Sequence, residues 1–181
     1  FWMHKDQQEY PVIRGRHSAD AAVVGGGLTG LITALWLSRA GLRVTLVEAA
    51  RLGSGASGCC AGVASVCGGN GYARVEKQRG VAAASVYART QASAFRALRD
   101  LAREQGPSSG WRDADVRLVA ESDGDARLLE KEAQAMMRAG LPASVGQPSL
   151  CPLPAVSALT VRDMGMLHPM RFLRYVAAQA V

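Results

Sequence analysis

Three glycines near the start of the chain are spaced as in a turn that binds phosphate. Gly25, Gly27 and Gly30 form the pattern G-x-G-x-x-G. In such a turn the first glycine permits a tight bend, the second lets backbone N–H groups approach a pyrophosphate, and the third lets a helix pack closely on a strand. The N-terminus of that helix favours an anion. The spacing predicts a dinucleotide site; the alternative is a buried, glycine-rich helix start in another kind of α/β domain.

The elements around these glycines support the dinucleotide interpretation. Residues 19–24 have the pattern of a fully buried parallel strand, residues 28–40 that of a helix ended by Gly41, and residues 43–48 that of a second strand. Glu48 closes the second strand, about 20 residues after the glycines, where a carboxylate can accept hydrogen bonds from ribose hydroxyls. An acid at this place disfavours the 2′-phosphate of NADP.

Composition narrows the class of protein. The 181 residues are 49% hydrophobic and 20% charged, which is ordinary for a globular protein. The net charge of +6 comes from scattered arginines without interleaved aromatic residues, so we expect no nucleic-acid partner. The apolar run at residues 23–37 is too short for a membrane span. The opening residues do not resemble a secretory signal, and we expect a cytoplasmic protein.

The cysteines predict no metal site. Cys59, Cys60, Cys67 and Cys151 form no C-x-x-C pair, and no histidine lies at zinc-ligand spacing. Adjacent Cys59 and Cys60 can bridge each other only with strain. We therefore expect reduced thiols in a reducing compartment.

The rest of the chain alternates helical and strand patterns. Residues 51–71 are small and glycine-rich, typical of a loop that lets backbone approach a ligand. Residues 77–105, 123–140 and 168–181 predict helices, and residues 115–121 and 157–165 predict strands. The expected core-facing residues of the first two helices are Val86, Phe95, Leu98 and Ala102, and then Leu128, Leu129, Ala133, Met136 and Met137.

Several of these motifs together resemble the D-amino-acid oxidase / glycine oxidase-like FAD-dependent oxidoreductases. The match comprises residues 24–34, Glu48, the glycine-rich loop at residues 53–62, the Trp- and Tyr-Pro-containing lead-in, and the passage VRDMGMLHPMRFLRYV. The resemblance implies an α/β fold, with a Rossmann-like FAD-binding βαβ unit and the beginning of an α+β substrate domain. It divides the chain into a lead-in at residues 1–19, the FAD-binding unit and flavin loop at residues 20–80, and a helical and sheet segment at residues 81–181.

The resemblance also implies which residues bind the cofactor. The pyrophosphate would lie at the glycine turn and the residues beside it: Gly25, Gly26, Gly27, Leu28, Thr29 and Gly30. Glu48 and Ala49 would bind the adenosine ribose, Ala56 and Ser57 would contact the phosphate–ribitol region, and Ala61, Gly62 and Val63 would run close to the flavin ring. Cys59 and Cys60 depart from the family, which commonly has Arg-Asn or small residues there.

The implied reaction is oxidation of the C–N bond of an amine or amino acid, with hydride passing to flavin N5 and an imine as product. No catalytic residue is identified: His168 is favoured as a residue held at a helix N-terminus, and Arg171 and Arg174 are only potential carboxylate ligands. Family members are about twice this long, so a longer chain or a second polypeptide would complete the fold. The alternatives are a dinucleotide-binding module without activity, and an NAD-dependent dehydrogenase, which would not need the small-residue loop after Glu48.

Overall fold

The computed structural model describes residues 10–68, 71–148 and 154–180. The lead-in up to residue 9, with its Trp and His4, and Cys151 lie outside these ranges. Residue contacts divide the chain into two compact units, each made of separate segments. The first unit comprises residues 1–63, 102–110 and 167–181, and the second comprises residues 64–101 and 111–166. The three-part division expected from the sequence stays a prediction.

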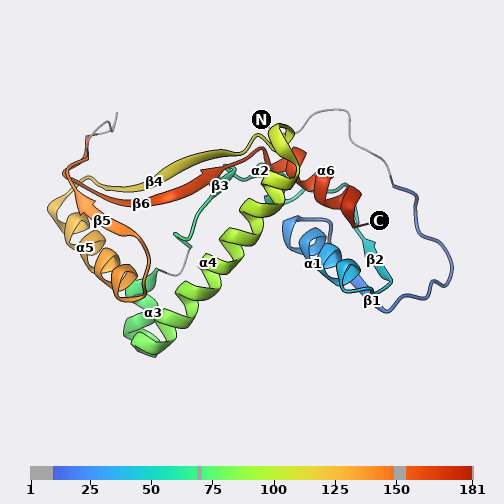
Figure 1. Ribbon diagram of the computed structural model, residues 1–181, viewed down its shortest axis with the longest axis horizontal. Helices are drawn as coiled ribbons and strands as arrows, with labels where there is room; N and C mark the ends of the chain where they lie inside the picture. Colours follow the sequence, from blue (N-terminus) through green and yellow to red (C-terminus); the bar gives the residue numbers. More distant parts are fainter. Residues whose placement is uncertain (1–9, 69–70, 149–153, 181) are drawn as a thin grey trace. The chain divides into compact units, whose positions relative to one another are not determined.

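The first unit begins with a parallel strand–helix–strand arrangement (Figure 1). β1 (Ala21–Val24) pairs in parallel with β2 (Val44–Val47), and α1 (Leu28–Arg39) connects them. The helix buries Leu31, Ala34 and Leu35. It ends at Gly41, whose φ of +85° allows the Leu42 N–H to donate back to the Leu37 carbonyl at 3.1 Å. All three elements confirm the prediction from the sequence.

The expectation that the first strand is fully buried is wrong for this chain. Val24 is 84% exposed, and Ala22 is exposed as well. A parallel strand is buried on both faces only when helices cover both sides of its sheet. In the described part of the chain this sheet has two strands, and α1 is the helix that connects them.

The remaining elements of the first unit come from distant parts of the sequence. They are α2 (Ala56–Cys59), the 3-10 helix η1 (Gly106–Ser109) and α6 (Pro169–Gln179). α6 buries Phe172, Leu173 and Val176, and it packs against α1, α2 and η1. Its predicted start is confirmed, with Pro169 in the first turn, where a missing N–H costs nothing.

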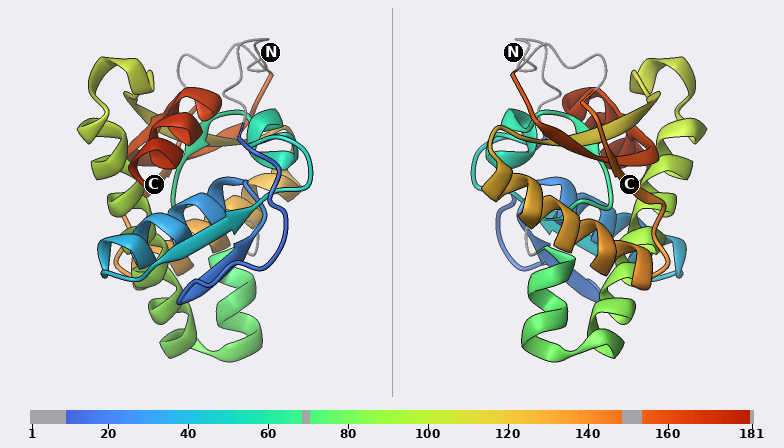
Figure 2. Two further views of the ribbon diagram at one scale, coloured as in Figure 1. Left: turned by 90° about the vertical axis from the view of Figure 1, so that its right-hand side faces the viewer. Right: turned by 90° about the vertical axis from the view of Figure 1, so that its left-hand side faces the viewer.

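The second unit is an antiparallel sheet covered by helices. β4 (Arg112–Ala120) pairs with β6 (Ser157–Met166) along its length, and β5 (Ala143–Gly146) also pairs with β6. The two-residue β3 (Val63–Ala64), at the boundary of the units, belongs to the same sheet. Figure 2 shows α5 (Asp123–Arg138) below β4 and β6, and α5 contacts both strands and β5. The core of this unit includes Phe95, Met136, Leu159 and Val161.

Glycine divides the long helix that the sequence predicts over residues 77–105. α3 (Tyr72–Arg79) starts earlier than expected, and Gly80, with φ +84°, separates it from α4 (Val81–Glu104). Gly106–Ser109 form η1, and β5 and the short α2 and β3 were not predicted. Short elements with few side chains give too weak a periodicity to be recognised in sequence.

The expected apolar faces of two helices are partly wrong. Val86 in α4 is 53% exposed, whereas Ala88, about 200° further around the helix, is buried. In α5, Leu128 and Met137 are exposed, whereas the burial expected of Ala133 and Met136 is confirmed. The buried stripe is narrower than the apolar sequence pattern, because apolar residues at its margins point away from the hydrophobic core.

No helix among the described residues is both long and apolar enough to span a membrane.

The two adjacent methionines of α5 offer a matched test of the packing. Met136 is 1% exposed and belongs to the core of the second unit, whereas Met137 is 51% exposed. Met136→Ala is expected to lower the free energy of unfolding by about 2–4 kcal/mol because it leaves a cavity. Met137→Ala should change it by less than about 0.5 kcal/mol. Urea unfolding followed by circular dichroism measures both, and equal losses would contradict the orientation of α5.

Candidate dinucleotide site

Gly25 and Gly30 have the structural roles that the spacing of the motif predicts. Gly25 has a φ of +109°, which makes the tight bend after β1, and its N–H donates to the Val47 carbonyl at 2.8 Å. A Cβ on Gly30 would collide with the Gly25 carbonyl oxygen. The helix therefore packs on the strand at a distance that only glycine permits.

Gly26 and Gly27 lie directly under the loop that follows β2. A Cβ on Gly26 would collide with the Leu52 side chain, and one on Gly27 would lie 3.1 Å from Ser57 Oγ. The Gly53 N–H donates to the Gly26 carbonyl at 2.9 Å, which fixes the loop on the turn. The structure thus brings the two conspicuous glycine-rich stretches of the sequence into direct contact.

The N-terminus of α1 has backbone N–H groups that can donate hydrogen bonds to a ligand. The Leu28 N–H donates to Ser57 Oγ at 3.0 Å. Within the described ranges, the N–H groups of Gly27, Thr29 and Gly30 have no protein acceptor. Unsatisfied N–H groups at a helix start, with the positive end of the helix dipole, suit a phosphate oxygen. The residues present therefore fit a pyrophosphate.

Glu48 follows β2 directly and faces the glycine turn. Its Oε2 accepts from the Gly26 N–H at 2.7 Å, and its Oε1 accepts from the Ala50 N–H at 3.0 Å. These two hydrogen bonds, the one from Gly26 foremost, hold the pKa of Glu48 below its ordinary value. Each carboxylate oxygen keeps a further lone pair for another donor, such as a ribose hydroxyl.

A groove of about 920 Å³ runs along β2 and includes Glu48 and Ala49 in its wall. Leu31 and Ala34 of α1 and the strand residues Val44 and Leu46 line it. The segment at residues 10–14 and the end of α6, at Ala177 and Ala180, complete its walls. This space is large enough for an adenosine group and is predominantly apolar, as ligand sites usually are.

The remaining predicted cofactor residues lie further along the same loop. Ala56 and Ser57 open α2, and Ser57 is half-buried whereas Ala56 is exposed. Ala61 is exposed and Val63 is 55% exposed. Gly62, with φ +75°, presses its backbone against Leu167, whose N–H donates to the Gly62 carbonyl at 2.9 Å. Within residues 61–63, this hydrogen bond fixes Gly62, and the neighbours on both sides of it are exposed to solvent.

Sequence reasoning missed how Ser57 is used. We expected a phosphate–ribitol contact, but the hydroxyl also accepts the Leu28 N–H and so caps α1 from a distant loop. The signal was weak, because the two residues are 29 positions apart and a helix cap is normally sought in the residue just before the helix. For His168 the structural interpretation is confirmed: it caps α6, with Nδ1 accepting from the Arg171 N–H at 3.4 Å.

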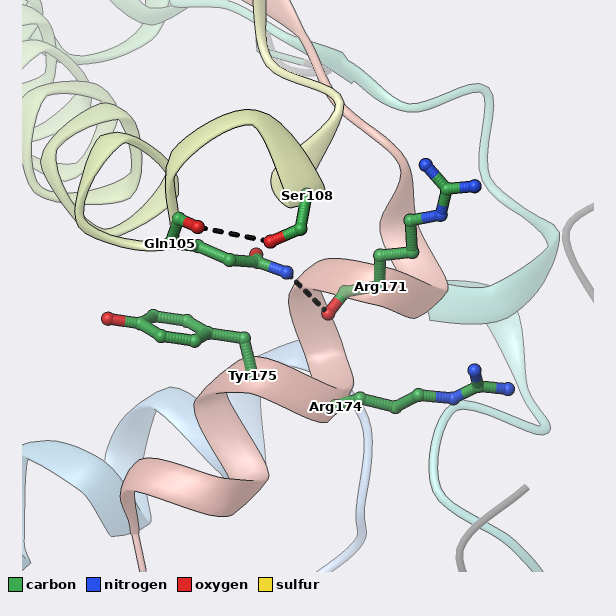
Figure 3. A pocket seen from close by; sticks show the side chains of 5 residues that line it. All are labelled: Gln105, Ser108, Arg171, Arg174 and Tyr175. Carbon is green, nitrogen blue, oxygen red and sulfur yellow. Dashed lines mark hydrogen bonds between the residues drawn. The ribbon is translucent and has the colours of Figure 1, made fainter. Parts of the chain in front are cut away.

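Arg171 and Arg174 line a different hollow, of about 400 Å³, with Gln105, Ser108 and Tyr175 (Figure 3). Gln105 Nε2 donates to the Arg171 carbonyl at 3.1 Å, which ties the end of α4 to α6. The hollow shares no lining residue with the groove along β2. Both arginine side chains extend away from Tyr175 in Figure 3, so they do not converge on one ligand with it.

In the part of the chain that the structure describes, no group of three or more His, Cys, Asp and Glu side chains could hold a metal ion.

Comparison with known proteins decides the family. A family model described as DAO, FAD dependent oxidoreductase, matches residues 20–181. The chain belongs to this family. The family is FAD-dependent, and its matched region contains every cofactor residue predicted from the sequence, from Gly25 to Val63.

Individual members of the DAO family and of its fold resemble the chain over part of their length. Gamma-glutamylputrescine oxidoreductase from Escherichia coli (strain K12) is 32% identical over 127 residues, covering 68% of this chain and 29% of that protein. A glycine oxidase structure from Geobacillus kaustophilus has a TM-score of 0.68 at 19% identity, covering 91% of this chain and 45% of its own.

An L-amino acid deaminase structure from Proteus vulgaris, lacking its specific insertion sequence, has a TM-score of 0.70 at 17% identity and covers 97% of this DAO-family chain. The chain corresponds to 45% of that structure. These structures confirm the fold, a parallel βαβ start followed by an antiparallel sheet. The chain spans less than half the length of each of these three relatives.

The hydrogen bonds of Glu48 predict a pH-dependent contribution to the stability of this DAO-family chain. A carboxylate whose pKa is lowered in the folded state stabilises the fold above its unfolded-state pKa, and this stabilisation is lost as the pH falls through the lower folded value. The natural chain should therefore be more stable than Glu48→Gln at pH 7. The difference should shrink below the ordinary glutamate pKa of about 4.3.

Urea unfolding of both proteins between pH 7 and pH 3 measures this difference. Glu121→Gln is the control, because Glu121 is exposed and its carboxylate makes no hydrogen bond to a described residue. A stability difference between the natural chain and Glu48→Gln that does not change with pH would contradict the assigned hydrogen bonds.

Proposed function

We propose that this chain is the FAD-binding part of an oxidoreductase that oxidises the C–N bond of an amine or amino acid. The observation that carries the proposal is the set of N–H groups without a protein acceptor at the start of α1, with Glu48 beside them in the wall of the groove. The free N–H groups suit an anion, and the carboxylate of Glu48 suits the hydroxyl groups of a sugar. A dinucleotide has both groups.

Each predicted residue has a role that its position supports. The N–H groups of Gly27, Thr29 and Gly30 hold pyrophosphate oxygens, and Ser57 donates its hydroxyl proton to the same group while accepting from Leu28. Gly25 and Gly26 shape the turn, as their φ angle and close contacts require.

The adenosine half of the cofactor uses the groove. Glu48 accepts the ribose hydroxyls through its remaining lone pairs, with Ala49 next to it. Ala56 lies on the route from the phosphates to the flavin. Ala61 and Val63 are exposed on either side of the buried Gly62, and this stretch would lie close to the flavin ring, where a larger side chain would keep backbone from the ring. FAD, when bound, supplies the hydride acceptor for C–N oxidation.

The substrate class rests on the named relatives. The Escherichia coli relative acts, by its name, on gamma-glutamylputrescine, and the two structural neighbours are a glycine oxidase and an L-amino acid deaminase. All three names describe an amine or an amino acid. We therefore propose a small amine or amino acid as the substrate and the cytoplasm, where exposed thiols stay reduced, as the compartment.

The second candidate is a dinucleotide-binding module without turnover of its own. The observation that favours it is length, because the chain spans 29% to 45% of the relatives compared. The first unit also leaves apolar surface uncovered, notably at Val24 and Val12. A further part of the same protein or a second polypeptide would then supply the rest of the substrate site.

The first experiment is a visible absorption spectrum of the purified chain and of the supernatant after heat denaturation. A flavin spectrum, with FAD in the supernatant, is the expected result. If the protein is colourless, FAD is titrated into it and binding is followed by flavin fluorescence. Saturable binding supports the proposal; no binding of FAD together with binding of NAD would contradict it.

Substitution of two serines in the loop after β2 tests the FAD site more specifically. Ser57→Ala is expected to weaken FAD binding about three- to tenfold, since it removes one hydrogen bond to the phosphate. Ser54→Ala is the matched control: Ser54 is exposed in the same loop, its backbone N–H donates to the Arg51 carbonyl, and its hydroxyl makes no hydrogen bond to a described residue. If both substitutions weakened FAD binding equally, the assignment of Ser57 to the FAD site would be contradicted.

A further inference from the structure

The loop that packs on the dinucleotide turn carries two adjacent exposed thiols, Cys59 and Cys60. Cys59 is the last residue of the short helix α2, and Cys60 is extended, with φ −72° and ψ 162°. Both ends of this stretch are anchored. Ser57 accepts the Leu28 N–H on one side, and the Gly62 carbonyl accepts the Leu167 N–H on the other. The two thiols are therefore exposed to solvent in a segment that hydrogen bonds anchor on both sides.

We infer that Cys59 and Cys60 are a peroxide-sensitive modification site that closes reversibly into a vicinal disulfide. In the first step one sulfur attacks hydrogen peroxide, its thiol becomes a sulfenic acid, and one water leaves. In the second step the neighbouring sulfur displaces the hydroxyl group from the sulfenic sulfur, and the hydroxyl leaves as water with the thiol proton. Two thiols and one peroxide thus give one disulfide and two waters.

A disulfide between adjacent cysteines is strained, and this strain favours a modification that is readily reversed. Adjacent Cα atoms are about 3.8 Å apart, shorter than the span of about 4.4–6.8 Å in most disulfides. A strained and exposed disulfide is easily reduced, as regulatory rather than structural disulfides are. The adjacent thiol also provides the resolving cysteine that a sulfenic acid needs. The sequence-based expectation of reduced thiols is thus the resting state of the pair.

Cys67 is the contrasting thiol among the described residues. It is half-buried, and burial raises the pKa of its thiol, so that less of the reactive thiolate is present. Peroxide should therefore modify the adjacent pair before it modifies Cys67.

Closure of the bridge would act on the dinucleotide turn. The ring draws Cys59 out of the single turn of α2, and that turn carries Ser57, whose hydroxyl holds the Leu28 N–H. Oxidation is therefore expected to weaken FAD binding about three- to tenfold, as loss of one hydrogen bond would. This consequence rests on the proposed function, whereas formation of the disulfide does not.

The test uses the full chain with Cys67→Ser and Cys151→Ser, which leaves only the adjacent pair. The chain is treated with hydrogen peroxide, remaining thiols are alkylated with iodoacetamide, and the intact mass is measured. The expected product is a monomer lighter by two hydrogen atoms that carries no alkyl group, and dithiothreitol should restore both thiols. Peptide mapping of the oxidised natural chain gives the same information without substitutions.

Single variants provide the control. With Cys59→Ser or Cys60→Ser added, one thiol remains, and peroxide should stop at a sulfenic acid that dimedone traps. The inference is overturned if the pair stays fully alkylated, if it proceeds to sulfinic acids, or if it links two chains. FAD titration of the oxidised and reduced chain then tests the coupling, and equal affinities would overturn it. Because mass reports the disulfide whether or not FAD binds, failure of the inference and failure of the proposed function are distinguishable.

Discussion

The missing side chains of Gly26 and Gly27 are the constraint on which the candidate site depends. They allow the loop after β2 to lie on the turn after β1, with the Gly53 N–H bonded to the Gly26 carbonyl and Ser57 bonded to the Leu28 N–H. A methyl group at Gly26 would displace Leu52 and, with it, the loop. Two segments that would each be poorly ordered alone therefore stabilise each other.

The electrostatics of the site follow from the same contact. The turn presents N–H donors and the positive end of α1, and a single ionised acid, Glu48, lies beside them. Glu48 satisfies the Gly26 N–H and leaves the donors of Gly27, Thr29 and Gly30 to an anion. One carboxylate thus fixes the geometry of the turn without occupying the place of the phosphate.

Local patterns in the sequence predicted the elements near the site well, because the glycine spacing and Gly41 act within a few residues of one another. The strand–helix–strand unit, the cap at His168 and the family were all predicted. What could not be predicted depends on contacts between distant residues: the Ser57–Leu28 hydrogen bond, the pairing of β5 with β6, and the exposure of Val86, Leu128 and Met137. The exposure of Val24 likewise depends on the strands and helices that surround its sheet. The residues of a single strand do not indicate how its sheet is covered.

The first unit is assembled from segments that lie far apart in the sequence, and this affects how it can fold during synthesis. Leu31 and Leu35 leave the ribosome early, whereas α6, which packs against their helix, is synthesised much later. Until Val176 has emerged, the apolar face of α1 lacks its contact with α6, which leaves apolar surface exposed during synthesis. By contrast, the described strands of the second unit have all been synthesised once Met166 has been added, so they can pair before α6 packs on α1.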